Sequence, residues 1–92
     1  MTFTYPAVFK KNPDGSYRGT FPDLAGIDVT GRDLDDAIRN ARAAAFDWLT
    51  VEFEEDDPKL PSISELKDLK LKKGEVARYI EVHYRFFEGW DE

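Results

Sequence analysis

The chain has 92 residues, which is enough for one domain and leaves no room for a second of ordinary size. Its 19 acidic residues outnumber its 13 basic ones, and the net charge of −6 is the wrong sign for a protein that works mainly on nucleic acid phosphates. Cysteine is absent, which excludes disulfides and thiolate metal sites, and no apolar run approaches membrane-spanning length. We therefore expect one cytoplasmic domain over residues 1–92 that binds neither membrane nor nucleic acid. The acidity suits a basic protein partner, although it serves solubility equally well.

Two extended runs with a polar turn between them open the chain. Alternate residues predict two strands that share one buried face, made of Phe3, Tyr5, Ala7, Phe9, Tyr17, Gly19 and Phe21. The intervening Asn12-Pro13-Asp14-Gly15 favours a tight turn, because proline fixes φ and glycine allows a positive φ. Pro6 cannot donate to a strand ladder, so we expect it near the start of pairing; Gly19 is typical of a bulge or a close helix–sheet contact. After Pro22, a corner turns the chain into a short third strand over residues 27–30.

A long amphipathic helix follows, predicted over about residues 34–54. Asp33 fits the N-cap position, and Asp35 and Asp36 place negative charge at the positive end of the helix dipole. Apolar residues recur at the i, i+3, i+4 spacing: Leu34, Ala37, Ile38, Ala41, Ala45, Trp48 and Leu49. The alanines favour helix and allow a close approach to a sheet.

Beyond the helix the sequence predicts a connector and a last strand. Pro58 and Pro61 mark the connector, and Ser62-Ile63-Ser64-Glu65 matches a capping box that would start a turn or two of helix over residues 64–69. A strand follows at about residues 75–84. One of its faces carries Val76, Arg78, Ile80, Val82 and Tyr84, and the other Ala77, Tyr79, Glu81 and His83.

These elements predict an α+β fold, a two-layer β-β-β-α-β domain with one main helix on one face of a four-stranded sheet. We expect a mixed sheet, and if the last strand pairs parallel to the first, the crossover between them should be right-handed. The helix should cover the aromatic face. Nothing else in the chain is expected to cover the other face, which would then be open to a partner.

No pattern of catalytic, metal-binding or cofactor-binding residues emerges. The single histidine, His83, is expected at the surface, and no serine lies in a nucleophile-elbow context. The acidic cluster over residues 52–57 lacks the spacing and the turn glycine of a calcium loop. The element order is similar to the first part of the ribonuclease H fold, but the first strand carries no acid, so a two-metal nuclease would lack a principal ligand. We expect no enzyme and no cofactor.

Several motifs together resemble the HicB-type antitoxins. They are Tyr5-Pro6-Ala7-Val8-Phe9, the turn with Gly15, the corner Phe21-Pro22-Asp23-Leu24-Ala25-Gly26, and the helix start Asp33-Leu34-Asp35-Asp36-Ala37. Ala25 replaces the proline that is usual at this corner. The resemblance implies a partial ribonuclease H-like fold without nuclease activity, and a partner that is a small basic ribonuclease toxin of the HicA type. Many members also carry a C-terminal DNA-binding module, for which the residues after His83 leave no space, so we expect none here.

Composition alone suggests which residues contact such a partner. The candidates are Tyr79, His83, Phe86, Phe87 and Trp90, with Glu54, Glu55, Asp56 and Asp57 steering a basic surface by charge. The aromatic tail serves equally well to close the core or to form a homodimer, and we expect the chain to assemble as a homo-oligomer, a dimer or a tetramer. Two alternatives stay open: a self-associating module without a toxin, and, as the weaker one, a small hydrolase or nuclease.

Overall fold

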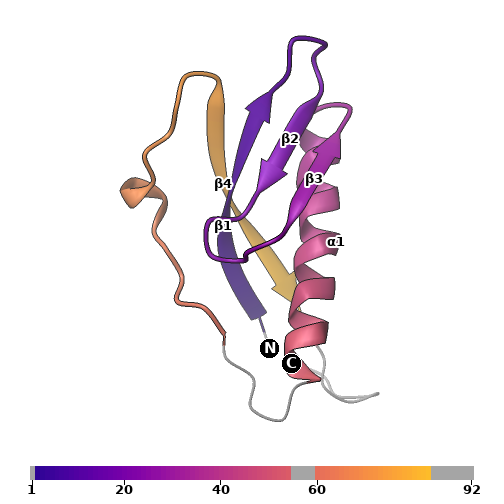
Figure 1. The fold of residues 1–92 in the computed structure, drawn as a ribbon, viewed down its shortest axis with the longest axis vertical. Helices are drawn as coiled ribbons and strands as arrows, with labels where there is room; N and C mark the ends of the chain where they lie inside the picture. Colours follow the sequence, from indigo (N-terminus) through magenta and orange to yellow (C-terminus); the bar gives the residue numbers. More distant parts are fainter. Residues whose placement is uncertain (1, 55–59, 84–92) are drawn as a thin grey trace.

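The computed structural model describes residues 2–54 and 60–83, which form a four-stranded sheet with one long helix packed on one face (Figure 1). The elements in chain order are β1 Thr2–Lys11, β2 Tyr17–Thr20, β3 Asp28–Gly31, α1 Leu34–Phe53, the short 3₁₀ helix η1 Leu66–Asp68, and β4 Glu75–His83. The predicted α+β class and the element order are confirmed.

The sheet has the strand order β3-β2-β1-β4, and all three neighbouring pairs are antiparallel. The expected mixed sheet is therefore wrong, because β4 pairs antiparallel with β1, from Thr2 opposite His83 to Lys10 opposite Glu75. The reason lies in the connector. In Figure 1, α1 runs down from the end of β3 at the right of the view. Residues 60–74 then rise at the left, on the side of the sheet away from α1. This return brings the chain to the end of the sheet opposite the end of α1, so β4 must run back against β1.

The β1–β2 hairpin forms as predicted. The N–H of Asn12 donates to the Ser16 carbonyl at 2.8 Å, Gly15 has a φ of 91°, and the Asp14 carboxylate accepts from the N–H and the hydroxyl of Ser16. Gly19 does not mark a bulge, because the register runs through it and it pairs with Phe9. A Cβ at Gly19 would lie 2.7 Å from the Phe9 ring, so this glycine makes room for an aromatic ring of the facing strand.

Pro6 occupies a different place from the one expected. β1 pairs with β2 only from Val8 onward, but it pairs with β4 from Thr2, so Pro6 lies in the middle of the β4 pairing, opposite Tyr79. On the β2 side this part of β1 pairs with none of the described strands, which is where a residue without an N–H is tolerated.

The core lies between the helix and the predicted aromatic face. Its buried residues are Tyr5, Ala7, Phe9, Phe21, Leu24, Ala37, Ala41, Ala45, Leu49, Ile80 and Val82. The helix contributes mainly alanines, which let its backbone lie close to the large side chains of β1 and β4. The Asp33 side chain accepts from the N–H of Asp36 at 2.8 Å, which confirms the predicted N-cap.

The connector holds the short helical turn expected within residues 64–69, as η1, but the capping box of Ser62 and Glu65 does not form: Glu65 occupies the N-cap position of η1, and no side chain caps it. The N–H and the hydroxyl of Ser64 both donate to the Asp23 carboxylate at 2.7 Å instead. The N–H of Leu66 also donates to the Tyr79 hydroxyl, and Pro6 is fully buried. The sheet face away from α1 is thus partly covered, and the expectation that nothing in the chain covers it is wrong.

Candidate partner-binding surface

The part of the chain that the structure describes offers a surface rather than an enclosed site. Among residues 2–54 and 60–83, no polar or charged side chain is buried apart from the Tyr5 phenol, and no group of three or more His, Asp or Glu side chains could hold a metal ion. None of the helices in these ranges is long and apolar enough to cross a membrane. The molecule presents concave apolar surface instead, and α1 borders two such grooves, one on each side of its buried stripe.

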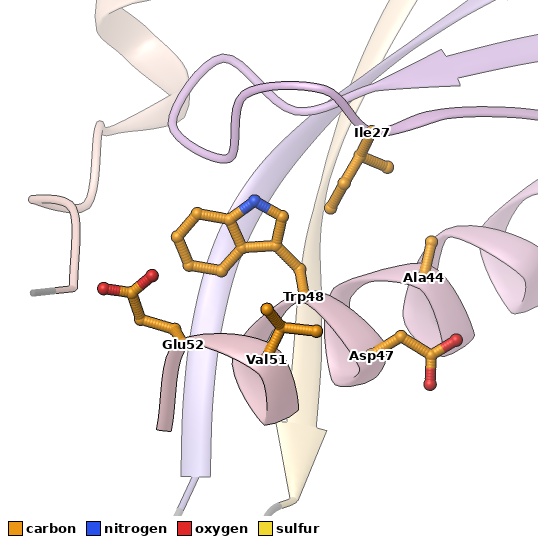
Figure 2. A pocket seen from close by; sticks show the side chains of 6 residues that line it. All are labelled: Ile27, Ala44, Asp47, Trp48, Val51 and Glu52. Carbon is orange, nitrogen blue, oxygen red and sulfur yellow. The ribbon is translucent and has the colours of Figure 1, made fainter. Parts of the chain in front are cut away.

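The first groove lies on the side of α1 that faces β3, and we call it the acidic groove. It is lined by Ile27, Ala44, Asp47, Trp48, Val51 and Glu52. Figure 2 shows Trp48, Val51 and Ile27 converging from the helix and from the loop before β3, with the two carboxylates to either side. The indole Nε1 of Trp48 donates to the Ala25 carbonyl at 3.1 Å, which fixes the ring against that loop. Val51 remains 61% exposed, so the groove has an apolar centre that the fold does not cover.

The second groove lies on the side of α1 that faces β4, and we call it the arginine groove. It is lined by Arg39, Arg42, Ala43, Phe46, Val82 and His83. Arg42 Nε donates to the Glu81 carbonyl at 3.2 Å, which holds this guanidinium against the edge strand. Phe46 is 40% exposed. The same helix thus presents carboxylates along one side and guanidinium groups along the other.

The structure places the contact residues predicted from composition on separate elements. Tyr79 and His83 share the outer face of β4. Tyr79 is 47% exposed, and its hydroxyl accepts from Leu66 N–H at 3.2 Å, so the ring already holds the connector. The exposed His83 hydrogen-bonds to the Thr2 hydroxyl through Nδ1, and its Nε2 lies 2.9 Å from the Glu81 carboxylate. Glu54 is exposed at the C-cap of α1. The remaining candidates lie outside the described residues: Glu55, Asp56, Asp57, Phe86, Phe87 and Trp90.

Sequence reasoning missed the acidic groove. The helix pattern predicts Trp48 in the apolar stripe and Val51 just outside it, widening the apolar face near the C-terminal end, but it does not predict that the two line a groove with carboxylates. The available signal was the neighbouring pair Asp47 and Trp48 followed by Val51, which places a carboxylate beside apolar residues on one side of the helix. The contribution of Ile27 could not be read from the helix pattern, because it comes from another element.

The family follows from a comparison with known families, in which the model of the HicB_like antitoxin of bacterial toxin-antitoxin systems matches residues 5–86. The chain belongs to the HicB-like antitoxin family. The resemblance drawn from the corner and the helix start is therefore confirmed, and it extends beyond those motifs into β4.

Two solved structures share the fold of this HicB-like chain. The N-terminal domain of the Burkholderia pseudomallei antitoxin HicB is 26% identical, with a TM-score of 0.77 over 89% of this chain and 100% of that one. A toxin-antitoxin complex from Streptococcus pneumoniae contains a chain that is 23% identical, with a TM-score of 0.68 over 90% of this chain and 70% of that one. The latter likeness concerns the fold alone. A comparison with curated proteins found no match.

Proposed function

We propose that this HicB-like chain is a cytoplasmic antitoxin that binds and masks a small basic ribonuclease toxin of the HicA type, without catalysing a reaction itself. Membership of the antitoxin family is the observation that carries the proposal. The net charge of −6 supports it, because an acidic domain attracts a basic partner and speeds their encounter. The exposed apolar groove beside α1 supports a binding role, since large apolar side chains that the fold leaves uncovered are typical of interaction surfaces.

Co-expression tests the proposal. We expect the reading frame beside the gene of this chain to encode a HicA-type protein, which should arrest growth when it is expressed alone, and growth should recover when both are expressed. The purified pair should co-elute, and the toxin's ribonuclease activity should fall in proportion to the antitoxin added. Unchanged toxicity with no complex would overturn the antitoxin role.

The non-catalytic part of the proposal needs its own measurement. The purified chain alone should leave RNA intact. Turnover of RNA that disappears in Glu81→Ala or His83→Ala would instead show an enzyme, because these are the acid and the histidine that lie 2.9 Å apart on β4.

A second candidate function is self-association through β4, with or without a toxin. It is favoured by one observation: β4 lies at the edge of the sheet, so one side of its nine-residue backbone pairs with no described strand. Sedimentation of the purified chain over a range of concentrations would detect a homo-oligomer. A monomer at all concentrations would leave the toxin complex as the only assembly.

A further inference from the structure

We infer that the acidic groove is the docking surface of this domain, and that the toxin presents to it a lysine- or arginine-rich surface with an apolar side chain at its centre. The inference rests on the proposed function and names where the partner lies. Its three supports are the uncovered apolar centre, the negative field around it and the opposite charge on the other side of α1.

The apolar centre of the groove is formed by several apolar side chains that lie together, and not by one exposed residue. Val51 lies outside the buried stripe of the helix and is 61% exposed, so the fold gains little from its burial. A single exposed valine would need no explanation, but this one adjoins Trp48 and Ile27 in one concavity. The hydrogen bond from Trp48 to the Ala25 carbonyl sets the ring before any partner arrives, which reduces the entropy lost on binding.

Negative charge surrounds this centre. Asp47 and Glu52 line the groove, and Glu54 follows at the C-cap of α1. The groove also lies by the last turns of α1, where the helix dipole is negative and where the last turn itself contains no basic residue. A cationic side chain is therefore attracted both by the carboxylates and by the helix end.

The charges on the opposite side of α1 indicate which side of the helix a basic partner would contact. Arg39 and Arg42 line the arginine groove, together with His83. A basic partner is repelled there, since like charges brought together at an interface cost free energy. The helix thus admits a basic surface along one side only, and the acidic groove is that side.

The test measures binding of the HicA-type toxin to the full chain and to surface variants. Asp47→Lys should slow association about tenfold or more at low salt, because it reverses a charge that steers the encounter. Val51→Ser should instead speed dissociation, because it removes apolar contact at the centre. Both positions are exposed, so unchanged circular dichroism and thermal unfolding would show that the variants remain folded.

The matched control is Arg39→Glu, an exposed charge reversal on the other side of the same helix. It should leave the association rate unchanged or raise it. If the groove variants bind like the wild type while Tyr79→Ser or His83→Ala binds poorly, the docking surface is on β4 and the inference is wrong. If the wild-type chain itself does not bind the toxin, the proposed function fails instead.

Discussion

The distance between the sheet and α1 depends on single residues, and Gly31 is the clearest case. It ends β3 two residues before the helix N-cap. A Cβ built on it would lie 2.2 Å from the backbone nitrogen of Ala37 and 2.6 Å from its Cα. Backbone atoms of a helix cannot turn away as a side chain can, so any larger residue must push β3 and α1 apart.

We expect Gly31→Ala to lower the free energy of unfolding by about 1–3 kcal/mol or more, the cost of overpacking. Urea denaturation monitored by Trp fluorescence gives the measurement. Gly15→Ala is the control, because Gly15 has a φ of 91° and no atom within 4 Å of its Cβ position. It should lose only the cost of left-handed backbone, about 1–2 kcal/mol. A smaller loss at Gly31 than at Gly15 would contradict the close approach.

The buried phenol of Tyr5 predicts a loss of stability in alkali. Burial, and then the charge of Asp23, raise the pKa of Tyr5 above its ordinary value. The unfolded chain therefore ionises first as the pH rises past about 10, and the stability that the neutral phenol supplies is lost up to the folded pKa. Below about pH 10 that contribution is fully present.

Tyr5→Phe tests this directly. At neutral pH it should cost about 0.5–1.5 kcal/mol, because it removes the hydrogen bond from the phenol to the Pro61 carbonyl. Between about pH 9 and about pH 11 its denaturation midpoint should fall less than that of the wild type. Equal falls in the two proteins would show that other groups govern the alkaline loss.

Among the elements, those with local signals were predictable. The hairpin turn depends on four consecutive residues, and α1 on an N-cap with a 3.6-residue apolar repeat, so the sequence predicted both to within a residue or two. The direction of β4 was not predictable, because it depends on how far the connector travels. Ser64 misled for a similar reason. The box from Ser62 to Glu65 predicted a helix starting near Ser64, whereas the actual partner of Ser64, Asp23, is distant in sequence.

The connector is therefore held in place by hydrogen bonds to side chains from other parts of the chain, chiefly to that of Asp23. Asp23→Ala removes the acceptor of two hydrogen bonds at 2.7 Å. Bonds to a carboxylate contribute about 1.5–3 kcal/mol each. We expect residues 60–74 to be cleaved much faster by a protease of low specificity, with the fragments mapped by mass spectrometry.

The control for this variant is Asp14→Ala, which removes a comparable carboxylate from the β1–β2 turn. It should leave cleavage within the connector at the wild-type rate. Equal protection of the connector in Asp23→Ala and the wild type would mean that Tyr5 and Tyr79 alone hold it.

For the whole molecule, the acidic surface predicts a loss of stability in acid. The pKa of Asp14 is lowered by the Ser16 hydroxyl, that of Asp28 by its hydrogen bonds with Arg18, and that of Asp36 by the Arg32 N–H. A carboxylate with a lowered folded pKa stabilises the fold above its unfolded pKa. That contribution is lost as the pH falls below about 4, through the folded value.

Thermal unfolding at falling pH measures this loss. Asp28→Asn should show a smaller drop between about pH 5 and about pH 2 than the wild type, because the ion pair with Arg18 is already absent. High salt should reduce the difference between the two proteins, since both partners are largely exposed. Parallel curves at low salt would show that this pair contributes nothing to the acid transition.

The pairing of β1 with β4 joins Thr2 to His83, and we expect it to set the order in which the domain assembles. The hairpin and α1 need only nearby partners, whereas β4 must close a loop that contains nearly every other element, which makes it the slow step. Until it docks, β1 keeps an unpaired edge and the core lacks Ile80 and Val82. Pulse-labelled hydrogen exchange should protect the β4 amides last. Newly made chains would then pass through a state open to proteases. The rate at which β4 docks would therefore limit how fast folded antitoxin accumulates.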